Sequence, residues 1–309
     1  MAADPSPLRA ELAKSGFIIQ RSLLSPSELA ALRAAASRTT ALARSGDWPD
    51  VRTVGKQFPP WTAASEGVDI WGVQGLLHPS LPDAPVFARA YFGDATLGVA
   101  KELLGPGGCG DEDLVMELFN LLVRPGRDFA LRWHRDDVPD EADDVEEARR
   151  LGLGDGEDGG KCYRTHTQWN LALYPDASLV VVPGSHARVR TAAERAAAAG
   201  PEADNMPGAV AVELGAGDAV FYDNNILHRG VYGAGQERMT LHGSVGRADA
   251  GPLRARNVLQ HGVGAWVGRC DFSGLGGEGD RIRRRAEGMR ERLVRLGRES
   301  GDVGYSLTG

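Results

Sequence analysis

The feature that most limits the fold of this chain is a series of short apolar segments between residues 114 and 247. The segments are rich in Val, Leu, Phe and Tyr, and turns containing Gly, Pro or Asp separate them, which is typical of β-strands. Many short strands flanked by helices indicate a mainly β fold with flanking helices (α+β), built as a double-sheet jelly roll. The predicted strands are 115–123, 130–134, 167–173, 178–182, 209–214, 218–222 and 238–245.

Helical patterns precede and follow these strands. Ser25, Pro26 and Glu28 predict a helix start, because Ser25 can cap, Pro26 suits the first turn and Glu28 completes a capping box. This helix is expected to end near Arg44, and residues 5–14 and 84–104 are also expected to be helical. We expect one domain over residues 1–309. Its parts would be a helical N-terminal layer (1–110), a jelly-roll core (111–250) with an acidic insertion (137–161), and a C-terminal helical tail (278–298) docked on the core or on a second subunit.

The composition argues against several classes of protein. A net charge of -7 disfavours nucleic acid as the main partner. No stretch approaches the ~20 apolar residues that span a bilayer, and the N-terminus lacks the apolar run of a signal peptide. Cys109, Cys162 and Cys270 are odd in number and far apart, which favours reduced thiols. We therefore expect a cytoplasmic protein without a membrane or nucleic-acid partner.

A metal site is predicted from His134, Asp136 and His228. His134 and Asp136 are two residues apart at the end of a predicted strand, and side chains at that spacing point to the same face. His228 follows a later strand and can supply a third ligand. Two histidines and one carboxylate on one face of an octahedron, with the other positions open, is the arrangement of non-haem Fe(II) oxygenases. Another histidine, His242, lies on the Arg238 strand, and the sequence leaves its direction open.

The order and spacing of these motifs resemble the phytanoyl-CoA dioxygenase family of Fe(II)/2-oxoglutarate-dependent oxygenases. The resemblance covers roughly residues 8–247 and includes His134–Asp136, Leu179–His186, Gly217–Asp223, His228–Gly230 and Arg238–Thr240. It implies a double-stranded β-helix, which agrees with the jelly roll expected from the strands. It also implies an enzyme that uses Fe(II), 2-oxoglutarate and O2 to oxidise a small-molecule substrate, with hydroxylation as the expected outcome and succinate and CO2 as co-products.

The resemblance gives roles to individual residues of this sequence. His134, Asp136 and His228 would hold the iron. Arg238 would pair with the distal carboxylate of 2-oxoglutarate, since its planar fork suits a carboxylate. Thr240 lies two residues on, on the same strand face, and would bond the same carboxylate. Further candidates for cosubstrate contacts are Asn120, Trp169 and Asn170.

The acidic insertion 137–161 has no counterpart that we can align with the family. A run of charges is most often a solvated face. Its position directly after Asp136 makes a mobile lid over the site an alternative. On position alone, the residues expected to contact the substrate are Trp61, Trp71, Arg132, Trp133 and Gln168.

Two other functions are compatible with these residues. The same ligands can bind zinc or another divalent ion, so a jelly-roll metalloenzyme of hydrolase or isomerase type is one alternative. A non-catalytic binding protein on the same fold is the other. Arg238 and Thr240 favour the oxygenase, because a hydrolase has no use for a dicarboxylate clamp. The sequence does not identify the primary substrate or the oligomeric state.

Overall fold

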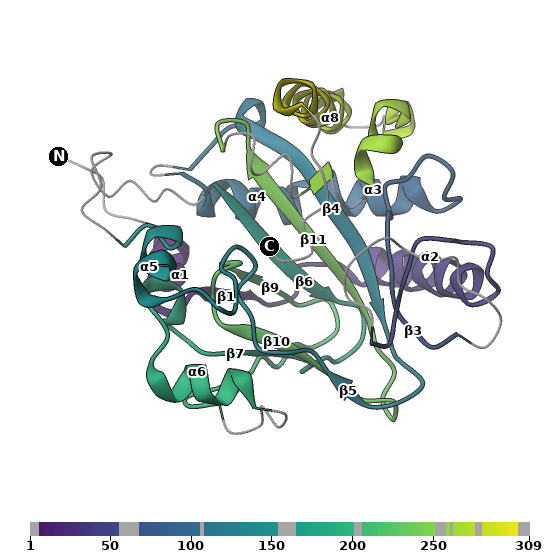
Figure 1. The fold of residues 1–309 in the computed structure, drawn as a ribbon. Coiled ribbons are helices and arrows are strands. Elements are labelled where there is room, and N and C mark those ends of the chain that lie inside the picture. The colour runs from purple at the N-terminus through teal and green to yellow at the C-terminus, as the bar shows by residue number, and fades with distance from the viewer. Residues whose placement is uncertain are drawn as a thin grey trace.

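The computed structural model has two antiparallel β-sheets with helices packed outside them (Figure 1). The structure describes residues 6–55, 68–105, 108–153, 165–200, 206–250, 258–259, 262–275 and 280–301. The larger sheet has the strand order β1-β9-β6-β11-β4-β3-β2, and the smaller has the order β5-β10-β7-β8. The predicted mainly β architecture with flanking helices is therefore confirmed.

The central strands of the larger sheet are long and almost entirely buried, as their apolar sequences require. Strand β11 pairs with β4 on one side and with β6 on the other. The strands of the larger sheet are β1 (Phe17–Gln20), β2 (Val51–Thr53), β3 (Ile70–Val73), β4 (Leu114–Val123), β6 (His166–Ala172), β9 (Ala219–Tyr222) and β11 (Met239–Arg247). Those of the smaller sheet are β5 (Phe129–Ala130), β7 (Leu179–Val181), β8 (Val210–Ala211) and β10 (His228–Tyr232).

Helices cover the outer face of the larger sheet, where Figure 1 shows α2, α3 and α4 behind it and α8 at its upper edge. The start of α2 has the predicted capping box, in which Ser25 Oγ accepts the Glu28 N–H and Glu28 Oε2 accepts the Ser25 N–H. Helix α8 buries Met289 and Leu293 in the main core, so the tail docks on the core. The α-helices in the described parts of the chain are α1 (Pro7–Ser15), α2 (Pro26–Arg44), α3 (Ala84–Phe92), α4 (Asp94–Leu103), α5 (Asp144–Arg150), α6 (Ala192–Ala199) and α8 (Asp280–Ser300). Among the described helices, none is long and apolar enough to cross a membrane.

The predicted helix 84–104 is wrong as a single element. It is two helices that meet at Gly93, whose backbone is extended (φ -67°, ψ 157°). A Cβ at this position would lie 2.7 Å from the Arg89 carbonyl oxygen, so any other residue would force the chain to shift. The glycine therefore permits the break between α3 and α4.

The chain around the predicted metal ligands is also less regular than expected. The predicted strand 130–134 is reduced to β5, which ends at Ala130, followed by an isolated bridge between His134 and His228. Conversely, β2 and β3 form within residues 47–80, a region outside the predicted strands. Strand β3 pairs with β4 and so extends the larger sheet.

The alternation of side chains along the strands separates two cores. Phe119, Trp169 and Leu241 belong to the main core between the larger sheet and the helices. Ala172, Val181 and Tyr222 belong to a second cluster that joins residues of both sheets. The positions adjacent to Trp169 and Leu241 in sequence therefore point into the space between the sheets.

Candidate metal centre

His134, Asp136 and His228 come together between the two sheets. Each offers one ligand atom, and these atoms all lie within 4.8 Å of one another. His134 Nε2 is 3.6 Å and His228 Nε2 is 3.8 Å from Asp136 Oδ1. Within the described parts of the chain, this is the one group of three or more such residues that could hold a metal ion. Residues separated by about ninety positions in sequence are adjacent because His134 and His228 form a β-bridge.

Backbone carbonyls fix the tautomer of both imidazoles. His134 Nδ1 is 2.7 Å from the Arg132 carbonyl oxygen, and His228 Nδ1 is 2.8 Å from that of Ile226. Because a carbonyl only accepts, each Nδ1 carries the proton, and each Nε2 presents its lone pair toward Asp136. This is the hydrogen bonding that metal-ligating histidines commonly have. Burial, reinforced by the neighbouring His134, lowers the pKa of His228 to about 4, so this ring is neutral near pH 7.

The carboxylate of Asp136 is held by Gln168, whose Nε2 donates to Oδ2 at 2.9 Å. Burial acts to raise the pKa of Asp136, but the two histidines and Gln168 outweigh it, and the pKa is lowered. The exposed fraction of the side chain falls from 34% for Asp136 to 20% for His134 and 8% for His228. The site is therefore ionised on the carboxylate, neutral on His228, and open to solvent on the side of Asp136.

Arg238 and Thr240 lie together, and both contact a residue that the sequence analysis missed, Asp176. Arg238 Nε is 3.2 Å and Thr240 Oγ1 is 2.5 Å from Asp176 Oδ2. Arg238 also lies over the ring of Tyr232, with its Cζ 4.4 Å from the centroid. Burial acts to raise the pKa of Asp176, but the Arg238 charge and bonds from Ser178 and Thr240 lower it. An ionised carboxylate therefore already occupies part of the predicted clamp.

One nitrogen of the clamp has no described partner. Arg238 Nη1 is buried and makes no hydrogen bond among the described residues. A buried guanidinium N–H without an acceptor is costly, so this position suits the carboxylate of a bound molecule. The Asp176 contact leaves this second donor available.

Asn170 and Trp169 point in opposite directions, as neighbouring residues of a strand must. The ring of Trp169 lies among Tyr91 and Phe221 in the helix-side core, so we assign it to the core and not to cosubstrate contacts. Asn170 faces the other side, where its Oδ1 is 2.8 Å from His242 Nδ1. The sequence analysis left the direction of His242 open, although Arg238, Thr240 and His242 alternate along β11 and this spacing could have indicated it.

His242 and Asn120 complete this polar row. His242 stands opposite Asn120 on β4 and Asn170 on β6 in the strand register. Burial, then the nearby Arg52 charge, lowers the pKa of His242 to about 3, so its ring is neutral. Asn120 Oδ1 accepts the Gly75 N–H at 3.1 Å, and its Nδ2 has no partner among the described residues.

The residues expected to contact the substrate have different locations. Gln168 binds a metal ligand, as described above. Trp133 is buried with Val182 and Leu227 in a small cluster that also contacts α6, although the ligand His134 follows it directly in sequence. Trp71 stacks on Tyr232 with ring centroids 5.4 Å apart, beside the Arg238 clamp. The Arg132 side chain is exposed, and Trp61 lies outside the described residues.

The fold and the triad define a class of protein, the non-haem Fe(II)/2-oxoglutarate-dependent enzymes with a jelly-roll core. The sequence profile of the phytanoyl-CoA dioxygenase (PhyH) family matches residues 12–239. The chain belongs to this family. No curated protein sequence matches the chain significantly.

Several solved structures are similar to this one at low sequence identity. AviO1 from Streptomyces viridochromogenes Tue57 has a TM-score of 0.51 and 21% identity, over 80% of this chain and 96% of AviO1. EctD from S. alaskensis with bound Fe has a TM-score of 0.53 and 20% identity, over 81% of this chain and 80% of EctD. The α-ketoglutarate-dependent epimerase SnoN from nogalamycin biosynthesis has a TM-score of 0.50 and 18% identity, over 80% and 84% of the two chains. These similarities support the fold.

Proposed function

We propose that this protein is an Fe(II)/2-oxoglutarate-dependent oxygenase that hydroxylates a small organic molecule. The observation that supports this most directly is the triad, in which two imidazole lone pairs and one carboxylate converge on one point. This donor set fits Fe(II), since it occupies one face of the coordination sphere and leaves the other positions for ligands.

The clamp separates this proposal from a hydrolase or a binding protein. Arg238 has a buried donor, Nη1, without a described partner, and it lies beside the hydroxyl of Thr240. A guanidinium and a hydroxyl together suit the distal carboxylate of 2-oxoglutarate. Zinc hydrolysis does not require such a group, and a non-catalytic protein does not require the triad.

When bound, iron and 2-oxoglutarate would supply an oxidant, which is generated from O2 as the cosubstrate is decarboxylated to succinate. The residues of the chain would orient the metal ligands and the cosubstrate. Gln168 holds the Asp136 carboxylate in one orientation, and the backbone carbonyls of Arg132 and Ile226 hold the two imidazoles. Arg238 and Thr240 would anchor the cosubstrate end remote from the metal, while Asn170 and His242 add a neutral polar wall.

The proposed substrate approaches from the side of Asp136, where the triad is most exposed. The exposed side chain of Arg132 is a candidate contact on that side. One similar structure is described as an epimerase, so this fold supports outcomes other than hydroxylation. The carboxylate ligand Asp136 argues against halogenation, in which a halide takes the place of that ligand, and we take hydroxylation as the expected outcome.

Conversion of 2-oxoglutarate to succinate tests this proposal. The purified full chain with Fe(II), ascorbate, 2-oxoglutarate and air should form succinate. At least one member of a panel of small organic substrates should raise the rate above that measured without substrate. His134→Ala should abolish succinate formation, because the metal loses one of its three ligands. Wild-type protein that binds Fe(II) but forms no succinate with any substrate would favour the hydrolase, isomerase or binding alternatives.

A further inference from the structure

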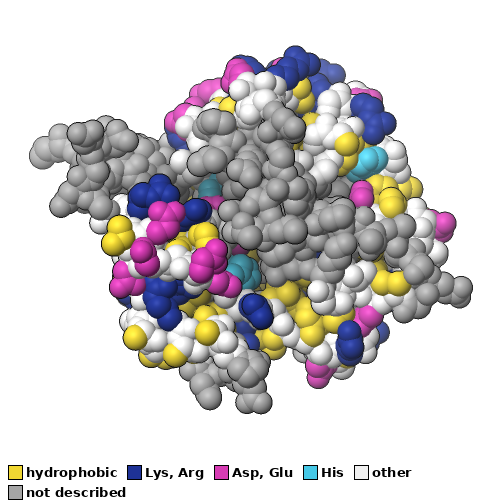
Figure 2. Space-filling view, viewed as in Figure 1, with side chains coloured by type: hydrophobic (Ala, Val, Ile, Leu, Met, Phe, Trp, Pro, Cys, Tyr) yellow, Lys and Arg dark blue, Asp and Glu magenta, His cyan; other side chains and the backbone are white. Residues whose placement is uncertain are grey.

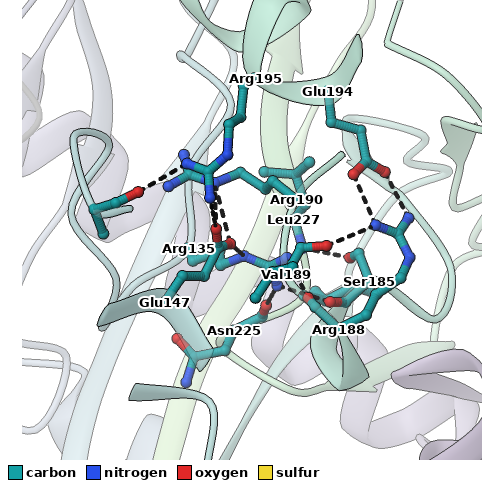
Figure 3. A network of polar contacts seen from close by, with 12 residues as sticks. Arg135, Glu147, Ser185, Arg188, Val189, Arg190, Glu194, Arg195, Asn225 and Leu227 are labelled. Carbon is teal, nitrogen blue, oxygen red and sulfur yellow. Dashed lines mark hydrogen bonds and ion pairs between the residues drawn. The ribbon is translucent and has the colours of Figure 1, made fainter. Parts of the chain in front are cut away.

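A partly buried cluster of charged side chains, shown in Figure 3, adjoins the chain segment that bears His134 and Asp136. It includes Arg135, which stands between the ligands His134 and Asp136, and Glu147 from helix α5 in the acidic insertion. Glu147 is 0% exposed and Arg135 is 4% exposed. Figure 2 shows acidic and basic side chains mixed on the surface over α5. The expectation that the insertion is a solvated face is nevertheless wrong for Glu147, because this side chain is buried. The cluster consists of Arg135, Glu147, Arg188, Arg190, Glu194 and Arg195.

The guanidinium of Arg135 binds four acceptors on three segments. Its Nε donates to Glu147 Oε1 at 2.8 Å. Its Nη1 donates to the carbonyl of Ser185 at 3.0 Å and also to that of Asn225. Its Nη2 donates to the carbonyl of Arg188 at 3.1 Å. One side chain therefore connects α5, the turn after β7 and the loop that leads to His228.

The contacts of Arg135 hold a part of the chain that has little regular secondary structure. Between Ala130 and His166 the described chain has no strand, and His134 is held to the sheet by a single bridge to His228. The loop before His228 is joined to the His134–Asp136 segment by the Asp136 N–H, which donates to the Asn224 carbonyl at 3.1 Å. Arg135 fixes the same two loops from the buried side, as the contacts in Figure 3 show.

The charges in the cluster are arranged so that Arg135 can be tested separately. Glu147 also accepts from Arg190 at 3.1 Å and from Arg195 at 2.5 Å. If Arg135 is replaced, Glu147 keeps two cationic partners and is not left unpaired. Loss of Glu147 would instead leave the buried Arg135 and Arg190 without their carboxylate partner, which is strongly destabilising.

We propose that Arg135 is a positioning residue for the metal centre and that it couples the α5 segment of the acidic insertion to the geometry of the triad. It touches neither metal nor substrate. It holds the backbone of both ligand-bearing loops, so the three ligand atoms are already placed before a metal arrives. The inference rests on the proposed metal function, and α5 becomes part of the site's framework and not a separable lid.

Cobalt(II) binding to the metal-free full chain tests this role, followed by the visible absorption of the bound ion. Arg135→Met should weaken Co(II) binding about 10- to 100-fold, the range for groups that orient metal ligands. Arg190→Met is the matched control, because Arg190 is also buried and also binds Glu147, but its other contact is with the Pro139 carbonyl, three residues after Asp136, and it makes no described contact with the loop before His228. It should change the affinity less than about twofold, because the ligand-bearing loops keep their contacts with Arg135.

The sign of the change distinguishes positioning from simple electrostatics. Removing a cation close to a divalent-ion site should tighten binding if charge alone matters. Arg135→Lys keeps the charge but cannot reach four acceptors, so we expect it to weaken binding as well. Unchanged or tighter binding in folded Arg135→Met, full rescue by Arg135→Lys, or equal weakening in Arg190→Met would overturn the proposal.

Hydrogen exchange in the wild type gives a second test that needs no variant. Co(II) should slow amide exchange in 144–150, because the metal rigidifies the loops to which Arg135 and Glu147 connect this helix. Unchanged exchange in α5 on metal binding contradicts the coupling. Wild-type protein that does not bind Co(II) at all would instead refute the proposed metal function itself.

Discussion

The buried ion pair between Arg238 and Asp176 allows a quantitative prediction for Arg238→Met. Both side chains are 6% exposed, so neither charge can be solvated when its partner is removed. Breaking a buried pair by removing one partner costs about 3–5 kcal/mol. Asp176 would keep three hydrogen bonds, two from Ser178 and one from Thr240. We therefore expect a loss in the free energy of unfolding near the lower limit, about 3 kcal/mol at pH 7.

The same reasoning predicts a partial rescue. In the double variant Arg238→Met with Asp176→Asn, no buried charge remains unpaired, so about 1–2 kcal/mol should return. The pH dependence has a defined sign. In the wild type the lowered pKa of Asp176 stabilises the fold at pH values above the unfolded-state pKa of about 3.9. This stabilisation is lost as the pH falls through the folded-state pKa. Without Arg238 that pKa should rise, and the cost of Arg238→Met should shrink as Asp176 takes up a proton.

Urea unfolding followed by circular dichroism at pH 7 and pH 5 measures both effects. A loss below about 1 kcal/mol, or a double variant no more stable than Arg238→Met, would refute the buried-pair account. The folded variant should also require much more 2-oxoglutarate for succinate formation, since the cationic donor is absent. An unaltered cosubstrate requirement would show that Arg238 has no part in binding it.

Three further predictions concern the site and the insertion. Gln168→Leu should weaken metal binding about tenfold, because Asp136 loses its hydrogen bond; an unchanged Mn(II) titration would contradict this. The folded-state pKa of His242 is lowered to about 3, so stability is complete above about pH 6.5 and falls below it. Between pH 7 and pH 5, His242→Asn should therefore lose about 1–2 kcal/mol less stability than the wild type. Parallel profiles of unfolding free energy against pH for the wild type and His242→Asn would exclude this role. Glu147→Gln should lower the free energy of unfolding by about 3 kcal/mol, whereas Glu146→Gln on the exposed face of α5 should have a much smaller effect, and equal losses would argue against burial as the cause.

Much of the fold could be predicted because its signals are local. The strands from 114 onward show alternating or continuous apolar residues, and the capping box at Ser25 and Glu28 marks the start of α2 within one residue. The ligand triad was identifiable because His134 and Asp136 are close in sequence and because His228 lies in a motif that resembles the phytanoyl-CoA dioxygenase family. These features depend on neighbours in the chain and not on the tertiary structure.

The features that were missed depend on contacts between distant residues. Asp176 lies between β6 and β7, where it forms an isolated bridge with Leu214, and only the fold brings it to Arg238, 62 positions later. Glu147 resembles every other acid of the insertion, and its burial follows from arginines 12 to 48 positions away. Trp133 and Trp169 are both large aromatics near the site in sequence, but strand direction and packing place each in a different hydrophobic cluster.

The central claim is that His134, Asp136 and His228 hold iron and that 2-oxoglutarate binds to it there. Adding Fe(II) and 2-oxoglutarate to the full chain without oxygen, and recording the visible spectrum, tests it most directly. We predict the charge-transfer band of the chelate in the wild type and its loss in His134→Ala. Absence of the band in the wild type, or an unchanged band in His134→Ala, would contradict the account.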